Sequence, residues 1–490
     1  MALPPLRLLI TGLFVTFGGS FHFGYQLSAV NPTQKVLRQF FNQSFLSHYD
    51  RQITEAELTF LWSTVTSIIV LGALIGALLM PKIAENMGRR KGLFVSCFCF
   101  IAASFPSALS ANFNSFELFI AGRILFGVGV GLSTGLQGLY LSEISPTASR
   151  GFISTFTGLM LQFGLTVGAF LGLPTVWGTS NLWPNIYWLE IAPSALLVVV
   201  LYFSYESPTY LMAKGLPQQS KRSLIVYHDQ KEVGKQLAEI REELSLQTES
   251  LGIRQLLSAR LARKGTLLGV IANSAISFSG ACAICFYATH LLTVAGFSYN
   301  HAAYANLAIS GSTLFGAVMS TWTIERFGRR TLLLFSCSFL GVANCVLIVL
   351  IVIYQQFHYE QIAYIYLVVN ILFMAAFGVG VSSVPWFITT EMVPQNAKAA
   401  AQGLAVTVQY LTGFITPVLF LNLESWIGPF SFLVFAIPMI ACTVYFYFFL
   451  PETRNRSVTD VLCELYGDEA VKTEKESIPL TNSKNDAVNV

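Results

Sequence analysis

The chain carries little charge for its length, since only 11% of its 490 residues are Asp, Glu, Lys or Arg. A soluble chain has about 25% charged residues, so an ordinary soluble enzyme is excluded. The formal net charge is only +3, which argues against a nucleic-acid partner. Instead, 54% of the residues are apolar, and they gather in long blocks.

Cysteine is missing from the segments where a disulfide framework would need it. The eight cysteines fall inside apolar blocks or in the C-terminal tail, which excludes a disulfide scaffold. Cys282 and Cys285 form a CxxC that we interpret as helix packing. No other group of His, Cys or carboxylates has catalytic or metal-ligand spacing. We therefore expect no metal and no cofactor, and an enzyme is the least favoured class.

Twelve apolar blocks are long enough to cross a bilayer, which takes about 20 residues per helix. Lipid offers the backbone no hydrogen-bond partners, so each block is predicted to be a helix and the fold an all-α membrane protein. The predicted spans are 8–30, 59–82, 92–111, 117–141, 152–176, 185–204, 265–292, 301–323, 331–354, 362–388, 399–422 and 428–450.

Lys and Arg concentrate at alternate junctions between these spans. They cluster at 82–91 and 325–330, whereas five alternate junctions hold none, near 112–116, 177–184, 293–300, 355–361 and 423–427. The positive-inside rule and the even span number place both termini in the cytosol. Segment 31–58 is then extracellular, and its Asn42-Gln43-Ser44 triplet predicts glycosylation of Asn42 at the plasma membrane.

Two short motifs occur once in each half of the chain. Gly88-Arg89-Arg90 follows the second span and Gly328-Arg329-Arg330 the eighth; Glu143-x-x-Pro146-x-x-x-Arg150 follows the fourth and Glu391-x-x-Pro394-x-x-x-Lys398 the tenth. Matched motifs predict two six-helix halves, 1–205 and 265–450, with a linker at 206–264 and a tail at 451–490. We expect the linker to form amphipathic helices at the cytosolic face.

The repeated charges predict an ionic latch at the cytosolic rim, whose pairs break when the halves rock apart. The alternative is that they only fix the topology. Glutamates at matched positions favour the latch. Its members would be Arg89, Arg90, Glu143, Arg150, Arg329, Arg330, Glu391 and Lys398.

Further motifs between residues 8 and 457 complete the pattern: Leu61-Trp62-Ser63, Gly122-Arg123, Glu206-Ser207-Pro208, Pro385-Trp386-Phe387 and Pro451-Glu452-Thr453-Arg454. Together they resemble the sugar porter family of the major facilitator superfamily, closely the animal facilitative glucose transporters. The resemblance implies the major facilitator fold, and alternating access of one central site to a hexose such as glucose or fructose. It implies no use of ATP, and the chain has no GxxxxGK[ST] phosphate loop.

The resemblance also implies site residues, which are Gln162, Ser277, Thr313, Trp386 and Gln409 for the sugar and Tyr287 for gating. The family glutamine of the fifth span falls on Gly158, and Gln162 lies one turn further on. The seventh-span motif Gln-Gln-Leu-Ser-Gly-Ile-Asn is here Ile276-Ser277-Phe278-Ser279-Gly280-Ala281-Cys282. Thr313 and Gln409 replace asparagines, and Gly378 replaces a glutamate. These losses point away from glucose as the favoured sugar. Helix–helix hydrogen bonding is the alternative role of Gln162, Ser277 and Thr313, and packing is the alternative role of Trp386.

The first span reads Phe23-Gly24-Tyr25-Gln26 where proton-coupled relatives have an aspartate in the last position. Glutamine does not titrate, which favours uniport. Arg123 is a buried cation that needs a partner, and Glu190 lies at a similar depth. We predict an ion pair between them; alternatively Glu190 faces a watery crevice or the headgroups.

Other partners and functions stay open at this point. Besides a small-molecule sugar and membrane lipid, the C-terminal Ala487-Val488-Asn489-Val490 matches what a PDZ-type groove binds. A proton-coupled sugar or polyol carrier that uses Glu190 is the first alternative function. A non-transporting sugar sensor is the second.

Overall fold

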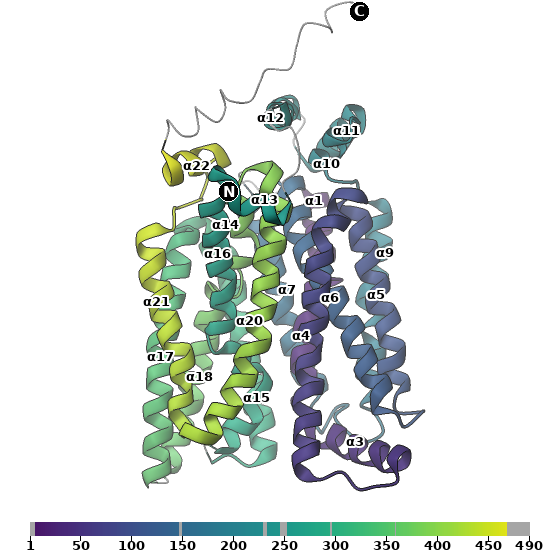
Figure 1. The fold of residues 1–490 in the computed structure, drawn as a ribbon, viewed down its shortest axis with the longest axis vertical. Coiled ribbons are helices and arrows are strands. Elements are labelled where there is room, and N and C mark those ends of the chain that lie inside the picture. The colour runs from purple at the N-terminus through teal and green to yellow at the C-terminus, as the bar shows by residue number, and fades with distance from the viewer. Residues whose placement is uncertain are drawn as a thin grey trace, which may run out of the picture.

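The structure is a computed structural model that describes residues 5–146, 149–228, 233–245, 252–294, 296–357 and 359–467. Two helical bundles stand side by side (Figure 1). In the described residues, eleven helical segments are long and apolar enough to cross a membrane. The predicted span 399–422 is not among the eleven, but it forms the 30-residue helix α20 (Lys398–Ile427), which packs against α4 and α14.

The first bundle contains the six N-terminal spans, and α4 and α5 both pack on α6 while α2 packs on α7. Its helices are α1 (Leu6–Phe17), α2 (Ser20–Ala29), α3 (Gln34–Tyr49), α4 (Glu55–Asn86), α5 (Arg89–Leu109), α6 (Phe116–Ile144), α7 (Arg150–Leu171), α8 (Pro184–Leu189) and α9 (Ile191–Phe203).

The second bundle repeats this arrangement with the remaining spans, and α16 packs on α18, α14 on α20, and α17 on α21. Its helices, besides α20, are α14 (Arg260–Phe278), α15 (Ala281–Val294), α16 (Tyr299–Phe327), α17 (Arg329–Phe357), α18 (Glu360–Val379), α19 (Pro385–Glu391), the 3₁₀ helices η1 (Gln395–Ala397) and η2 (Gly428–Phe432), and α21 (Leu433–Phe449).

Short helices cover one end of both bundles, which we call the linker end (Figure 1). They are α10 (Pro208–Ala213), α11 (Pro217–Tyr227), α12 (Val233–Ser245), α13 (Ile253–Ser258) and α22 (Val458–Tyr466). The helices expected in the linker are therefore present. Helix α3, which carries Asn42, lies at the opposite end of the first bundle. We call that end the loop end.

The two bundles meet through equivalent helices. Helix α7 of the fifth span contacts α16 of the eighth, and α4 of the second span contacts α20 of the eleventh. The fifth span corresponds to the eleventh and the second to the eighth, so both contacts join the same kinds of helix. This is expected when each half repeats the same six spans.

Four predicted spans are broken helices, which corrects the sequence prediction of continuous ones. The first breaks at Gly18 and Gly19, where a Cβ on Gly19 would lie 1.8 Å from Gln137 Nε2. The sixth breaks at Glu190, between α8 and α9. The seventh breaks at Gly280, whose φ of +92° suits glycine. The tenth breaks between Val379 and Pro385. Irregular backbone at membrane depth is stable only where protein or a cavity surrounds it.

Candidate substrate site

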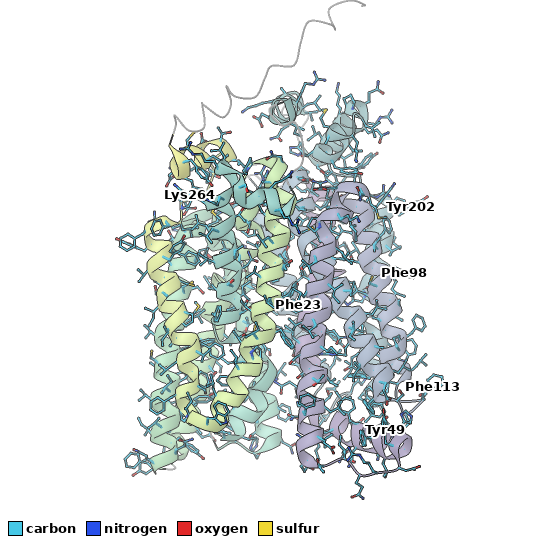
Figure 2. All side chains as sticks on the ribbon, in the orientation of Figure 1. Phe23, Tyr49, Phe98, Phe113, Tyr202 and Lys264 are labelled. Atoms are coloured by element: carbon cyan, nitrogen blue, oxygen red, sulfur yellow. The ribbon has the colours of Figure 1, made fainter. Side chains whose placement is uncertain are left out.

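A cavity lies between the two bundles, lined by residues of α2, α4, α7, α14, α15, α18, α19 and α20. Phe23 of its lining lies between the bundles in Figure 2. The cavity volume is about 50 Å³, room for a few water molecules at roughly 15 Å³ each. A six-carbon sugar therefore fits only after the halves separate or side chains move.

Four of the five predicted sugar-binding residues line this cavity: Gln162, Ser277, Trp386 and Gln409. Thr313 is buried in α16 outside the lining, and its hydroxyl donates to Ile309 O at 3.1 Å. Tyr287 belongs to α15, but its side chain lies outside the part of the chain that the structure describes.

Gln162 is the polar group of the cavity that most needs a ligand. Its side chain is fully buried in α7, and neither amide atom has a hydrogen-bond partner among the described residues. A buried amide left in that state costs free energy of about 1–3 kcal/mol. The Oε1 atom of Gln409 is likewise buried without a hydrogen-bond partner among the described residues. These atoms are suited to hydroxyl groups of a bound solute.

The geometry of α7 explains why the glutamine stands at 162 and not at 158. A Cβ built on Gly158 would lie 2.6 Å from Ser383 Oγ, because α7 packs directly against the break in the tenth span. A long side chain at 158 would push the two halves apart. Gln162 lies one turn along the same helix, where the cavity gives its side chain space.

Aromatic rings form one wall of the cavity. Phe23 packs edge-on to Trp386 with ring centroids 6.4 Å apart, and edge-on to Tyr410 at 5.7 Å. The indole Nε1 of Trp386 donates to Ser382 O at 2.9 Å. The Tyr410 hydroxyl lies 2.9 Å from Thr134 Oγ1 in the other half. Both polar tips are thus occupied, and the rings offer the apolar face on which a sugar ring can lie.

Ser277 already has hydrogen bonds within the protein. Its Oγ donates to Gln409 O at 3.0 Å and accepts from Thr412 Oγ1 at 3.1 Å. The helix–helix role considered from the sequence therefore applies to Ser277, although a hydroxyl can accept one more bond. The polar lining is consequently sparse.

Gly378, which stands where the family has a glutamate, lies at a close crossing of two helices. A Cβ on Gly378 would lie 2.4 Å from Thr313 O, so α16 and α18 cross at close range there. The same crossing holds Gly316 against Ala375 O. The loss of the family side chain at 378 thus accompanies closer packing of two helices.

A buried hydrogen-bonded chain runs behind the cavity, and it corrects the predicted direct pair of Arg123 with Glu190. Arg123 Nη1 donates to Gln26 Oε1 at 2.6 Å, and Gln26 Nε2 donates to Glu190 Oε1 at 2.7 Å. Gln26 separates the two charges because an amide can accept from a guanidinium and donate to a carboxylate. The cation and the anion still compensate each other through this bridge, in a fully buried site.

His22, which the sequence analysis did not single out, completes the hydrogen-bonded chain. Its Nδ1 lies 3.1 Å from Glu190 Oε2, and its Nε2 lies 2.8 Å from Ser194 Oγ. The imidazole also stacks on Phe100 at 4.2 Å between ring centroids. His22 stands one turn before Gln26 on α2, a spacing that points to one face of the helix.

The repeated charges at the linker end form two matched ion pairs. Arg89 Nη2 lies 2.8 Å from Glu143 Oε1, and Arg329 Nε lies 3.4 Å from Glu391 Oε2. Each pair joins helices of one half, so these two pairs do not have to break when the halves separate. That is a correction to the predicted latch.

Contacts that do cross between the halves involve Glu325, beside these pairs, and Arg329, which belongs to one of them. The backbone N–H of Phe152 in α7 donates to Glu325 Oε1 in α16 at 3.1 Å. A Cβ on Gly151 would lie 2.2 Å from Arg329 Nη2, so this guanidinium rests against the start of α7. Arg150 and Lys398 occupy the same rim as the first residues of α7 and α20.

The second arginine of each repeat holds helix ends within its own half. The carboxylate of Glu206 accepts the N–H groups of Arg89 and Arg90 at the start of α5, and the Arg90 Nε donates to Leu201 O at the end of α9 at 2.7 Å. In the other half Glu452 accepts from Arg329 and Arg330 at the start of α17, and Arg330 Nη2 donates to Tyr447 O of α21 at 2.6 Å. Carboxylates at helix starts and cations at helix ends are stabilising.

The candidate glycosylation site has an exposed acceptor. Asn42 is exposed on α3, while Ser44 of the same triplet is buried and donates to Asn114 O at 2.6 Å. Glycosylation of Asn42 stays a prediction. The C-terminal Ala487–Val490 lie outside the described residues.

The chain matches known proteins over nearly its whole length. The family model described as "Sugar (and other) transporter" matches residues 11–462. Human solute carrier family 2, facilitated glucose transporter member 9, is 30% identical over 457 residues, which cover 93% of this chain and 84% of that protein. Human member 4 is 29% identical over 460 residues, which cover 92% of this chain and 90% of that protein.

Among solved structures, the proton:xylose symporter XylE bound to 6-bromo-6-deoxy-D-glucose is similar in fold. The TM-score is 0.80 at 21% identity, with 94% of this chain and 99% of that chain covered. The family resemblance of the motifs and the all-α major facilitator fold expected from the spans are confirmed. With the family model spanning both bundles and the cavity between them, the chain belongs to the sugar transporter family of multi-pass membrane carriers and is not an enzyme.

Proposed function

We propose that this protein is a facilitative uniporter that carries a hexose such as glucose or fructose by alternating access. The observation that carries the proposal is the buried amide of Gln162, which faces a cavity between the halves and has no partner among the described residues. A hydroxyl-rich solute would satisfy the amide. The aromatic wall of Phe23, Trp386 and Tyr410 would cover the apolar face of the ring.

The sparse polar lining limits how well a sugar can be discriminated. Gln162 and Gln409 supply buried amide atoms that lack partners within the described ranges of the chain, while Ser277 is already bonded. A site discriminates strongly through the polar groups that a wrong solute leaves unpaired. We therefore propose modest affinity and broad acceptance of hexoses, with no strong preference for glucose.

Cross-half contacts on both sides of the cavity support alternating access. Asn31 Nδ2 donates to Cys285 O at 3.2 Å toward the loop end, and Phe152 donates to Glu325 at the linker end. Release toward one side requires that only the contacts of that side break. We place the linker end in the cytosol, because its cations follow the positive-inside rule, and the protein in the plasma membrane.

Counterflow of labelled glucose and fructose in proteoliposomes tests this proposal. For Gln162→Ala we expect a half-saturation concentration about tenfold higher, since about two hydrogen bonds of 0.5–1.5 kcal/mol are lost. Gln137→Ala is the matched control, because Gln137 is buried with both amide atoms likewise lacking partners among the described residues but does not line the cavity. Absence of counterflow with all hexoses and polyols would favour the sensor. Equal effects of the two variants would remove Gln162 from the site.

A second candidate, a proton-coupled sugar or polyol carrier, is favoured by the contact of His22 with Glu190. The two titratable groups share a buried hydrogen bond, and the buried groups of Arg123, Tyr25 and Tyr187 interact electrostatically with Glu190. Uptake against a sugar gradient when an inward proton gradient is applied would establish coupling. The uniport proposal requires that net flux follows the sugar gradient alone.

A further inference from the structure

A second cavity lies at the linker end of the C-terminal half, away from the substrate site. Its volume is about 360 Å³. It lies among the start of α14, the start of α17, the end of α21 and the helix α22. Figure 2 labels Lys264 at this end of the bundle.

Two cations line the cavity. Lys264 Nζ donates to Leu465 O at 2.8 Å and lies 5.1 Å from the ring centre of Tyr466. Arg330 Nη2 donates to Tyr447 O at 2.6 Å. An ammonium has three N–H donors and a guanidinium has five, so both cations have donors beyond these bonds.

The acidic groups beside the cavity already have cationic or N–H partners. Glu464, which lines it, is paired with Arg456. Glu452 accepts the N–H groups of Arg329, Arg330 and Arg454. The cavity therefore presents a positive field to an incoming group.

The remaining lining is largely apolar, and part of it is exposed on the outside of the bundle. Leu267, Phe448 and Phe449 line the cavity, and their exposed fractions are 51%, 70% and 59%. On helices that cross a membrane, such exposed apolar side chains face acyl chains. Cations directly next to an apolar, lipid-facing surface match the chemistry of a phospholipid, which has an anionic head and an apolar tail.

Helix α22 forms the cover of the cavity. Its first turn has a capping box in which Ser457 and Asp460 exchange hydrogen bonds. The Ser457 hydroxyl and backbone N–H hold the pKa of Asp460 below its usual value, so the carboxylate is charged at neutral pH. At the other end the Tyr466 hydroxyl accepts from the backbone N–H of Lys264 at 2.7 Å. The cover is thus fixed on the start of α14.

We propose that this cavity binds the headgroup of an anionic phospholipid from the leaflet at the linker end, with Lys264 and Arg330 on its phosphate and acyl chains along Leu267 and Phe448. Arg330 starts α17 beside Arg329, whose guanidinium rests against α7 of the other half. A bound lipid would therefore stabilise the region where the two halves meet. This assignment does not depend on which sugar is carried.

Native mass spectrometry of the delipidated full chain tests the proposal with phosphatidylserine and phosphatidylcholine as probes. We expect retention of phosphatidylserine over phosphatidylcholine. Lys264→Ala should weaken phosphatidylserine binding about fivefold, from about 1 kcal/mol per cation near an anionic lipid, and Lys264→Arg should restore it. Lys214→Ala is the matched control, since Lys214 also lies over a tyrosine ring, at 5.6 Å from that of Tyr210, but does not line the cavity.

Two further arms separate the possible reasons for a loss. Tyr466→Phe loosens the docking of α22 without removing charge, so a loss as large as that of Lys264→Ala would assign the effect to the cover and overturn the proposal. Millimolar inorganic phosphate should not displace phosphatidylserine, and displacement would identify a free-phosphate site instead. Equal retention of the two lipids would also overturn it.

Discussion

At the residue scale, single side chains decide what the buried parts of this carrier can do. Gln26 replaces an acid of proton-coupled relatives and becomes the bridge between Arg123 and Glu190. Gln26 itself neither takes up nor releases a proton, because an amide does not titrate. His22, four residues before Gln26 on the same helix, is the titratable side chain that contacts Glu190.

Removing the carboxylate of Glu190 from this hydrogen-bonded chain should lower the stability of the protein. In Glu190→Gln, Arg123 keeps its hydrogen bonds but loses its buried counter-charge, and breaking a buried pair costs about 3–5 kcal/mol. We expect a clear loss of thermal stability in detergent. The double variant Arg123→Gln with Glu190→Gln should recover part of the loss, and Asp50→Asn at the exposed end of α3 should show none. A fully stable Glu190→Gln protein would contradict the bridged pair.

Restoring the family glutamate should not restore a sugar site. In Gly378→Glu the new Cβ would lie 2.4 Å from Thr313 O, and overpacking costs about 1–3 kcal/mol. We expect reduced stability and reduced transport. Gly311→Ala on α16 is the control, because a Cβ there meets nothing within 4 Å. Fluorescence-detected size-exclusion chromatography after heating measures the stability of the two variants, and counterflow measures their transport. A stable, active Gly378→Glu protein would refute the close crossing.

At the scale of elements, each half connects the start of its third membrane span (α5 or α17) to the end of its sixth (α9 or α21). Glu206 and Glu452 cap the starts of α5 and α17, and Gly88 and Gly328 before them have φ of +91° and +89°. The repeat thus includes the pairs Glu206-Ser207 and Glu452-Thr453. Their hydroxyls donate to Glu143 and Glu391, the carboxylates of the ion pairs.

The second arginine of the repeat should act on stability rather than on the choice of open side. Arg90 donates to Leu201 O and to Tyr202 O of the same half. Bonds from charged groups contribute about 1.5–3 kcal/mol, so Arg90→Gln should lower the melting temperature while the distances between the halves stay unchanged. Lys91→Gln, at an exposed neighbour, is the control. A shift in inter-half distance with unaltered stability would support the latch first predicted for Arg90.

At the scale of the whole molecule, contacts between the two halves lie on both sides of the cavity. The direct N–H contact of α7 with Glu325 lies at the linker end, whereas the Asn31 contact lies toward the loop end. The balance between these two sets of contacts biases which side opens.

Weakening the linker-end contact should therefore shift the conformational equilibrium. In Glu325→Gln the acceptor for the Phe152 N–H loses its charge, and the charged bond becomes a neutral one that is weaker by about 1 kcal/mol. We expect about a fivefold shift toward the state open at the linker end. Distances between spin labels on α7 and α16 measure it, with Glu239→Gln on the exposed part of α12 as control. An unchanged distance distribution would remove Glu325 from the gate.

From the sequence alone, apolar block length, alternating cations and the repeated motifs indicated a helical membrane protein of two matched halves, and the resemblance of further motifs to the sugar porter family indicated a carrier. These signals suffice because lipid leaves a helix as the only way to satisfy the backbone of each span. Only the tertiary structure decided where four spans break, that Gln26 separates Arg123 from Glu190, that His22 joins them and that Thr313 lies outside the cavity. Those features depend on which faces of distant helices meet, and helical periodicity fixes a residue's side of its own helix but not the neighbour it finds there.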